Sequence, residues 1–539
     1  MNNKNSYRNI FLPILLAFSV VCGILIGFYL PKHNNEPRHT SIRPRSDKIN
    51  SILNIIETNY VDSVNRNELV EAAIPAILKK LDPHTVYISA KDLIRANEPL
   101  QGNFEGIGIS FSTLNDTIII INTIPNGPSE KAGLLAGDKI IYVNDSLIAG
   151  RGISDESIMS MLKGPRGTKV KVRIRRKTQD SLLTFNITRD KIPLVSLDVA
   201  YMVNQNTGFI KITNFALSTY DEFMKALSEL KSQGMTQLII DLRGNTGGIM
   251  EAAIEIAQQF LKKDQLIVYT KGRTQPKNEF KAKGNGAFET GNLVILIDET
   301  TASASEILAG AIQDNDRGTI IGRRSFGKGL VQEPVSFSDG SGIRLTVARY
   351  YTPSGRSIQK PYNNGFEEYY EDLNNRFNRH EFESSDNIHF PDSLKFTTNS
   401  GRIVYGGGGI MPDKFVAYDT SMLSPYFLRV RPLIYQYALK YTENNREKLI
   451  GYTNPKELGQ YLDKQKLLEG FTDFANKNSI RPDPKGLRIS GNYILVQLKG
   501  YIARNILDNK GAYPLWEQID NTLQYAISFL NDSVQKSLD

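Results

Sequence analysis

QLIIDLRGNTGGIMEAAIEIAQQFL, residues 237–261, is the most informative segment of this chain. It opens with a short, mostly apolar run, which is typical of a strand buried on both faces. A glycine-rich turn follows at residues 244–248, and apolar side chains then recur at the spacing of a helix. Strand, turn and helix in this order indicate one unit of a parallel sheet that is covered by helices.

The same pattern recurs further along the chain. Residues 292–298 (NLVILID) form a second apolar run, and after a short polar turn residues 306–313 (EILAGAIQ) have helical spacing. Residues 319–321 then supply another short strand. We therefore expect an α/β core with a parallel sheet within residues 191–425.

The composition is that of a chain that buries a core, with 40% hydrophobic and 23% charged residues among 539. This excludes wholesale disorder and a polytopic membrane protein. The net charge of +8 is mild for this length and does not indicate a nucleic-acid partner. The single cysteine, Cys22, excludes an internal disulfide, and the five histidines form no zinc motif. We expect no metal, no cofactor and no nucleic acid.

The N-terminal region predicts a membrane anchor. Residues 10–30 form an uncharged apolar run, long enough to cross a hydrocarbon core of about 30 Å. A cleaved signal peptide usually has a shorter apolar region and a small-residue cleavage site, and neither is found here. We expect residues 1–30 to be a signal anchor and residues 31–46 a linker. The rest of the chain would then lie on the periplasmic side of the cell inner membrane, held by a single pass.

Three further regions differ in character. Residues 47–100 have helical spacing, residues 101–190 are rich in β-branched side chains, and residues 426–539 read mainly as helices. Residues 169–177 (KVKVRIRRK) indicate a strand with a basic face, which is either its solvated side or a patch for anionic lipid. The sequence assigns no function to residues 426–539; formation of a homo-oligomer and gating of substrate both stay open.

Three turns follow strands of the expected sheet, at the edge where ligands gather in α/β proteins. They are residues 241–248 (DLRGNTGG), 300–306 (TTASASE) and 322–329 (GRRSFGKG). The third nearly matches a phosphate-binding loop, but Gly329 stands where Ser or Thr must ligate magnesium. The segment after it reads as strands rather than a helix, which disfavours nucleotide binding.

Ser303 is expected at the beginning of a helix, three residues before Glu306, which is the spacing of a capping box. A serine in this position is also suited to nucleophilic attack, because the helix dipole and free backbone N–H groups stabilise a developing oxyanion. Ala304 offers one such N–H group. Gly247 or Gly248 can supply a second, since glycine lets the backbone approach closely.

A nucleophilic serine needs a base, and no histidine lies between residues 85 and 379. A desolvated lysine is the other option, because desolvation lowers its pKa towards neutrality. Lys328 lies between two glycines, in a segment with little side-chain bulk. Taken alone, Lys328 also fits an ordinary solvated loop lysine.

Taken together, four motifs resemble those of the carboxyl-terminal processing proteases, which are serine peptidases of family S41 with a Ser–Lys dyad and an embedded PDZ domain. The motifs are DLRGNTGG at 241–248, SASEI at 303–307, FGKGLVQ at 326–332 and YYTPSGRSIQ at 350–359. The resemblance covers about residues 45–415. Several motifs in matching order make it specific, where any one alone would be weak.

The resemblance implies the catalytic residues. Ser303 rather than Ser305 is the nucleophile, because Lys328, the general base, follows it at the family's interval of 25 residues. Gln332 matches the glutamine that orients the lysine. The backbone of Ala304, Gly247 and Gly248 is expected to form the oxyanion hole.

The resemblance also implies that residues 101–190 are a PDZ domain. Such a domain adds the C-terminus of a peptide to the edge of its sheet and takes the last side chain into an apolar pocket. For each apolar candidate, a place in the ordinary core is the alternative. The implied peptide-binding residues are Gly106, Ile107, Gly108, Ile109, Ile158 and Leu162.

The implied fold is α+β and multidomain: a ClpP/crotonase-like α/β protease core with an inserted β-rich PDZ domain, an N-terminal helical segment and a C-terminal helical extension. The implied function is that of a membrane-anchored endopeptidase of the cell envelope, acting through an acyl-enzyme on proteins with free, apolar C-termini. The alternative is a catalytically silent PDZ scaffold or chaperone that only binds peptides. Intact Ser303, Lys328 and Gln332 argue against this alternative.

Overall fold

The computed structural model describes residues 48–363 and 365–538. The predicted anchor at residues 10–30 lies outside this part of the chain. Among the helices that the structure describes, none combines the length and the apolar character needed to cross a membrane.

The chain divides into two compact units, the first ending at Ala73 and the second beginning at Ile74. In its described part, the first unit contains α2 (Lys48–Asn59) and the beginning of α3 (Arg66–Leu78), as the helical spacing of this region predicts. Everything that bears on the candidate site belongs to the second unit.

The centre of the second unit is a six-stranded sheet in the order β10–β11–β12–β15–β16–β21. β10 is antiparallel to β11, and all other neighbours are parallel. The parallel α/β core predicted from the strand–turn–helix units is confirmed. The strands are β10 (Leu197–Met202), β11 (Thr207–Ile212), β12 (Gln237–Asp241), β15 (Asn292–Ile297), β16 (Thr319–Gly322) and β21 (Lys414–Phe415).

Helices cover both faces of this sheet. On one face, Ile240 of β12 belongs to the core formed with α7, α8 and α9. On the other face, the neighbouring Ile239 packs with Leu523 of α15, because successive side chains of a strand point to opposite faces. The last helix of the C-terminal extension is therefore a layer of the core. The helices are α7 (Thr219–Ser232), α8 (Met250–Gln258), α9 (Ala304–Asp314) and α15 (Asn521–Leu538).

A second sheet has the order β1–β18–β13–β14, with β17 also paired to β18. It carries Gln332 on β17 and Arg344 on β18, so it brings polar side chains towards α9 and its preceding turn. Strand β1 lies within residues 47–100, which the sequence predicted to be helical. The sequence pattern does not predict this strand because its pairing partner, β18, is far away in the chain. The strands are β1 (Val86–Ile88), β13 (Leu266–Lys271), β14 (Asn278–Lys281), β17 (Leu330–Ser336) and β18 (Gly342–Tyr351).

The predicted β-rich domain is present as a sheet in the order β3–β4–β5–β7–β8, with β6 paired to β5. In β7 the valines and isoleucine are buried and the basic residues between them are more exposed, as in a strand with one solvated face. Strands β2 and β9 pair separately. The elements are β2 (Asn103–Gly106), β3 (Ile109–Leu114), β4 (Thr117–Thr123), α5 (Pro128–Ala132), β5 (Lys139–Val143), β6 (Ser146–Leu147), α6 (Asp155–Leu162), β7 (Lys169–Arg175), β8 (Leu183–Thr188) and β9 (Asp190–Pro193).

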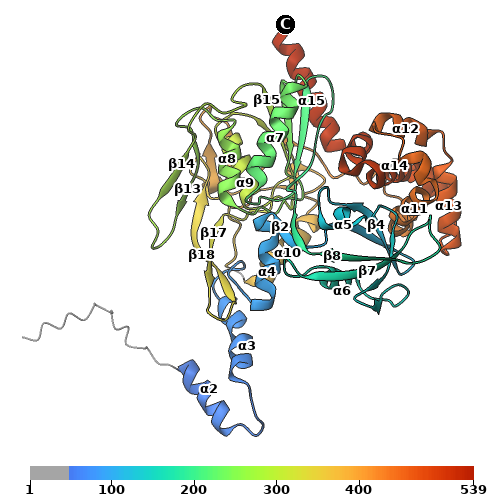
Figure 1. Ribbon diagram of the computed structural model, residues 1–539. Helices are drawn as coiled ribbons and strands as arrows, with labels where there is room; N and C mark the ends of the chain where they lie inside the picture. Colours follow the sequence, from blue (N-terminus) through green and yellow to red (C-terminus); the bar gives the residue numbers. More distant parts are fainter. Residues whose placement is uncertain (1–47, 364, 539) are drawn as a thin grey trace, which may run out of the picture. The chain divides into compact units, whose positions relative to one another are not determined.

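The C-terminal extension has a hydrophobic core of its own and also contacts the β-rich domain (Figure 1). Leu439 of α11 packs against Ile119 and Ile121 of β4. Asp508, at a kink in α14, accepts a hydrogen bond from the side chain of Asn122. The helices are α11 (Pro425–Leu449), α12 (Pro455–Asp463), α13 (Leu467–Lys477) and α14 (Pro484–Trp516).

The remaining elements are short or connect the larger ones. They are α4 (Ala90–Gln101), α10 (Phe366–Asn378), β19 (Lys395–Thr397), β20 (Ile403–Tyr405) and the 3-10 turns Ser385–Asn387, Asp392–Leu394 and Glu517–Ile519.

Candidate active site

Ser303 lies in the turn between β15 and α9, one residue before the helix begins. Its backbone has φ 59° and ψ −117°, a conformation that residues other than glycine rarely adopt. Strain of this kind persists only where the surroundings hold it, and it clusters at functional sites. The carboxylate of Asp298 holds the turn, accepting hydrogen bonds from the N–H groups of Thr300 (3.0 Å) and Thr301 (3.1 Å).

The carboxylate of Glu306 joins the serine to the lysine. It is fully buried in the first turn of α9. One oxygen accepts the backbone N–H groups of Ser303 and Lys328, both at 2.9 Å. The other accepts Ser325 Oγ at 2.5 Å and the Gly327 N–H at 2.8 Å. One buried side chain thus fixes the backbone of both residues, and its bond to Ser303 is the Glu306 half of the predicted capping box.

Burial raises the pKa of the Glu306 carboxyl to about 7, and the four donors act in the opposite direction. Three of those donors are backbone N–H groups, which cannot accept a proton from a carboxylic acid. The hydrogen-bond pattern therefore fits the ionised carboxylate, and protonation of Glu306 would weaken the link between Ser303 and Lys328.

Lys328 lies in the loop between β16 and β17. Its Nζ donates to Gln332 Oε1 at 2.9 Å. Burial lowers the pKa of the Lys328 ammonium and the charge of Arg344 lowers it further, while Glu306 and Asp82 act in the opposite direction. A lysine whose pKa is lowered is more readily neutral, and only the neutral amine accepts a proton.

The turn at residues 82–85 (DPHT) is a part of the site that the sequence analysis misses. The backbone oxygen of His84 accepts a hydrogen bond from Gln332 Nε2, so this turn fixes the glutamine that contacts the lysine. The His84 ring is hydrogen-bonded to the Tyr369 hydroxyl at 2.7 Å. Burial lowers the pKa of His84 to about 4, helped by the charge of Lys328. The imidazole is therefore neutral near pH 7.

The glycine loop (residues 243–248) follows β12 and is joined to the turn that carries Ser303. The backbone oxygen of Asn245 accepts the N–H of Ala302 and the hydroxyl of Ser305, both at 3.0 Å. Ser305 is thus occupied in holding the two segments together. This contact fits the expectation that Ser303, rather than Ser305, is the nucleophile.

Only glycine fits at Gly247, because a Cβ there would lie 2.7 Å from Ser303 Cβ and 2.9 Å from the nitrogen of Ala304. The close approach of this loop to the serine agrees with its predicted role. However, the N–H of Gly247 donates to the side chain of Asn245 at 2.9 Å. Gly247 is therefore a poor oxyanion donor in this conformation, which leaves Ala304 and Gly248 as the better candidates.

The apolar candidates of the β-rich domain lie together but not in an open pocket. Ile107, Ile158 and Leu162 are almost fully buried in one cluster, and Ile109 packs against it. In this conformation these side chains are part of the hydrophobic core of the domain, which is the alternative that the sequence left open.

The glycines of the same motif occupy the connection between two strands. Gly106 ends β2, and Gly108, with φ 73°, adopts a left-handed conformation that favours glycine. Near the other end of β3, Thr113 Oγ1 donates to Asp155 Oδ1 at 2.6 Å. This hydrogen bond joins the strand to the beginning of α6.

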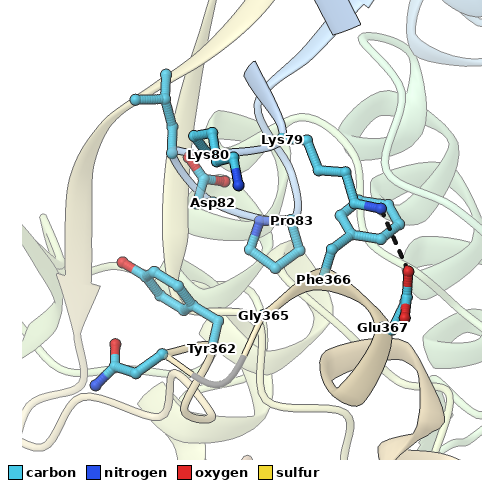
Figure 2. Close-up of a pocket in the computed structure, with 10 residues that line it drawn as sticks. Lys79, Lys80, Asp82, Pro83, Tyr362, Gly365, Phe366 and Glu367 are labelled. Carbon is cyan, nitrogen blue, oxygen red and sulfur yellow. Dashed lines mark ion pairs between the residues drawn. The ribbon is translucent and has the colours of Figure 1, made fainter. Parts of the chain in front are cut away.

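A cavity of about 480 Å³ borders the 82–85 turn (Figure 2). Asp82 and Pro83 line it, whereas Ser303 and Lys328 do not. At its rim, Lys79 forms an ion pair with Glu367 at 3.5 Å (Figure 2). The cavity thus borders the turn that fixes Gln332, and neither Ser303 nor Lys328 lines it. The lining residues are Lys79, Lys80, Leu81, Asp82, Pro83, Tyr362, Asn363, Gly365, Phe366 and Glu367.

A strained serine at a helix N-terminus, a lysine of lowered pKa and nearby backbone donors suit nucleophilic acyl transfer. Within residues 48–363 and 365–538, no group of three or more His, Cys, Asp or Glu side chains is placed to hold a metal ion.

Four family models match the chain. Residues 206–368 match peptidase family S41, and residues 106–187 match the PDZ domain. Residues 30–92 match the N-terminal domain of the activating protease CtpB, and residues 426–508 match a family of unknown function.

The chain is similar to curated proteases of bacteria. It is 36% identical over 317 residues to the carboxy-terminal-processing protease of Bartonella bacilliformis, covering 58% of this chain and 72% of the relative. It is 35% identical to the carboxy-terminal processing protease CtpB of Bacillus subtilis, covering 58% of this chain and 65% of that relative. Among solved structures, the photosystem II D1 C-terminal processing protease is 28% identical, with a TM-score of 0.32, covering 57% of this chain and 89% of that one.

Proposed function

Because the chain belongs to the carboxy-terminal processing proteases of peptidase family S41, and is thus a serine-type peptidase, we propose that it hydrolyses peptide bonds through an acyl-enzyme at Ser303. The observation that carries this proposal is the contact of Glu306 with both segments. Its carboxylate accepts the N–H of Ser303 and the N–H of Lys328 at 2.9 Å each. This contact supports the proposal that two residues far apart in the sequence act as one dyad.

In the proposed reaction, the Oγ of Ser303 attacks the carbonyl carbon of the scissile bond while neutral Lys328 Nζ takes the hydroxyl proton. The N–H groups of Ala304 and Gly248 stabilise the oxyanion. The C–N bond then breaks and Lys328 returns the proton to the leaving amine. Water, activated by the same amine, hydrolyses the acyl ester and restores the hydroxyl. Gln332 keeps the lysine oriented throughout.

We assign recognition of the substrate's C-terminus to the PDZ domain. The peptide would add as a strand beside β3, with its carboxylate at the backbone N–H groups of residues 106–109. Its last, apolar side chain would enter between Ile107, Ile158 and Leu162. Because these side chains are buried together in the present conformation, we propose that α6 moves aside when the peptide binds. The affinity of the domain then includes the free energy of opening.

We further propose that residues 10–30 anchor the protein in the inner membrane as a single pass, with the peptidase on the periplasmic side. The support is the length and apolar character of this segment in the sequence. Carbonate extraction of membranes from cells that make the full chain tests the anchor. Release of the full chain into the soluble fraction would contradict it.

The test of the peptidase is cleavage of an unfolded protein that ends in apolar residues by the full chain in detergent. We expect the wild type to cleave it, and Ser303→Ala and Lys328→Ala each to lose several orders of magnitude, because dyad members act as a unit. Normal turnover by either variant would contradict the mechanism. Calorimetry with an apolar-ended peptide and its C-terminal amide tests the PDZ domain; equal affinities would exclude carboxylate capture.

A further inference from the structure

Asp520 connects the C-terminal extension to the candidate active site. It lies immediately before α15, and its carboxylate accepts two hydrogen bonds from the Arg243 guanidinium, at 2.8 and 2.6 Å. The same guanidinium also donates to both oxygens of Asp241, from Nε at 3.0 Å and from a terminal nitrogen at 2.7 Å. Arg243 is thus held between one carboxylate of the core sheet and one of the extension.

Arg243 begins the glycine loop, so its position sets where the loop starts. The backbone oxygen of Arg243 also accepts a hydrogen bond from Lys211 Nζ. At its other end the loop approaches Ser303 so closely that a Cβ added to Gly247 would lie 2.7 Å from the Cβ of Ser303. Between these points Asn245 bonds to the turn that carries the serine. A displacement of Arg243 would therefore be transmitted to Ser303 through the few residues of the glycine loop.

Two cations and two carboxylates form the direct ion pairs of this cluster. Arg243 and Lys211 are cations, and Asp241 and Asp520 are their counter-ions. Asp241 is almost fully buried, and the side chains of Arg243 and Lys211 are mostly buried. Removing the charge of Asp520 would take one of the two direct counter-ions from Arg243 beside the loop, and loss of a partner from a buried ion pair is destabilising.

We propose that Asp520 is a positioning residue of the peptidase: through Arg243 it holds the glycine loop, and hence the Gly248 N–H, in the place where the oxyanion forms. The C-terminal extension then completes the active site. This inference rests on the proposed function of Ser303, because it concerns the same reaction.

The simpler role for Asp520 is a cap of α15, since its Oδ1 also accepts the N–H of Leu523 at 3.0 Å. Two substitutions separate the roles, because Asn and Ser cap helices about as well as Asp. Asp520→Asn keeps the cap oxygen and the shape but removes the charge. Asp520→Ser keeps an oxygen that can cap the helix, but the serine side chain is too short for this oxygen to reach both guanidinium nitrogens. A residue that only caps the helix would tolerate both.

The matched control lies in the extension itself. Asp463 pairs with Lys499 at 2.6 Å, and neither residue contacts the glycine loop. Asp463→Asn makes the same chemical change in the same helical region. We expect it to leave the kinetics unchanged.

The experiment uses the full chain in detergent and a peptide with a free apolar C-terminus. We expect Asp520→Asn and Asp520→Ser to lower kcat about tenfold with little change in KM, less than the 10²–10³ that follows removal of an oxyanion donor. Labelling of Ser303 by a fluorophosphonate should slow in parallel, while thermal unfolding stays near that of the wild type.

Wild-type kcat in both variants, or a loss of kcat that Asp463→Asn shares, would overturn the proposal. So would unfolding of both variants, because Asp520 would then be purely structural. A wild type that is neither labelled nor active would instead refute the peptidase function itself, so the two failures are distinguishable.

Discussion

Replacing Glu306 by Gln tests whether one buried carboxylate holds the serine and the lysine together. In the wild type each carboxylate oxygen accepts two hydrogen bonds, at 2.5–2.9 Å. An amide has only one oxygen. If its NH2 group faces Ser303 and Lys328, both backbone N–H groups lose their acceptor; if it faces Ser325 and Gly327, the Ser325 hydroxyl can accept from it and only the Gly327 N–H loses its acceptor. The substitution changes a single atom and leaves the volume of the side chain unchanged.

The expected loss can be worked out from these contacts. A hydrogen bond to a charged group contributes about 1.5–3 kcal/mol, so losing one or two of them costs about 1.5–6 kcal/mol. The upper end is a large part of the free energy of unfolding of a typical domain, about 5–15 kcal/mol. Because Gly327 adjoins Lys328, either orientation releases the backbone at the lysine, and we expect kcat to fall about 100-fold, as for a displacement near 1 Å at a reacting centre.

The assay combines peptide cleavage with thermal unfolding of the same preparation. Glu255→Gln is the matched control, because Glu255 is exposed on α8 and the chemical change is identical. We expect the control to keep both the activity and the unfolding temperature. If Glu306→Gln retained wild-type kcat and unfolding temperature, the carboxylate would not hold the dyad, and the reasoning would be refuted.

Three further predictions concern pH, the glycine loop and the extension. In the proposed mechanism protonated Lys328 cannot accept the Ser303 proton and protonated Glu306 weakens the link between the two residues, so we expect both forms to be inactive. The value of kcat/KM should therefore rise with pH through about 7, where Glu306 ionises, and level off below 10.5, the ordinary pKa of lysine. A plateau only above 10.5 would contradict the lowered lysine pKa. Gly247→Ala should lower kcat about 100-fold because its Cβ meets Ser303, whereas Gly244→Ala, with nothing within 4 Å of its Cβ, should lose far less; equal kinetic losses would exclude the steric explanation. Leu439→Ala should destabilise the contact with the PDZ domain by about 2–4 kcal/mol, measured by thermal unfolding and by proteolysis of that domain. Leu428→Ala, at an exposed site, is the control. Equal stability of the two variants would count against the contact.

Patterns over short stretches of chain account for what the sequence predicted well. The apolar run and glycine turn of residues 237–261 predicted β12, the glycine loop and α8. The spacing of apolar residues that distinguishes a strand from a helix is visible within a few consecutive residues of each element. The Ser303–Glu306 spacing likewise predicted the beginning of α9 and the hydrogen bond from the Ser303 N–H to Glu306.

The groups around the dyad could not be found in this way. The 82–85 turn looks in the sequence like the simple end of a helix, yet its carbonyl fixes Gln332. Its only signal is an Asp-Pro pair, which marks turns in general. The predicted pocket of Ile107, Ile158 and Leu162 has the right composition, but whether such side chains line an opening or fill a core depends on the distance between α6 and its sheet.

By itself, the sequence determined the family and the strand–turn–helix units of the core, and it predicted Ser303 and Lys328 as the reacting side chains, because each of these patterns lies in residues close together along the chain. Only the tertiary structure decided which groups hold those side chains: Glu306 bridges two loops, His84 reaches Gln332, and Asp520 of the last helical region reaches Arg243. These contacts join segments that are far apart in the chain. They form where packed layers bring donor and acceptor within about 3 Å, and no local pattern records that distance.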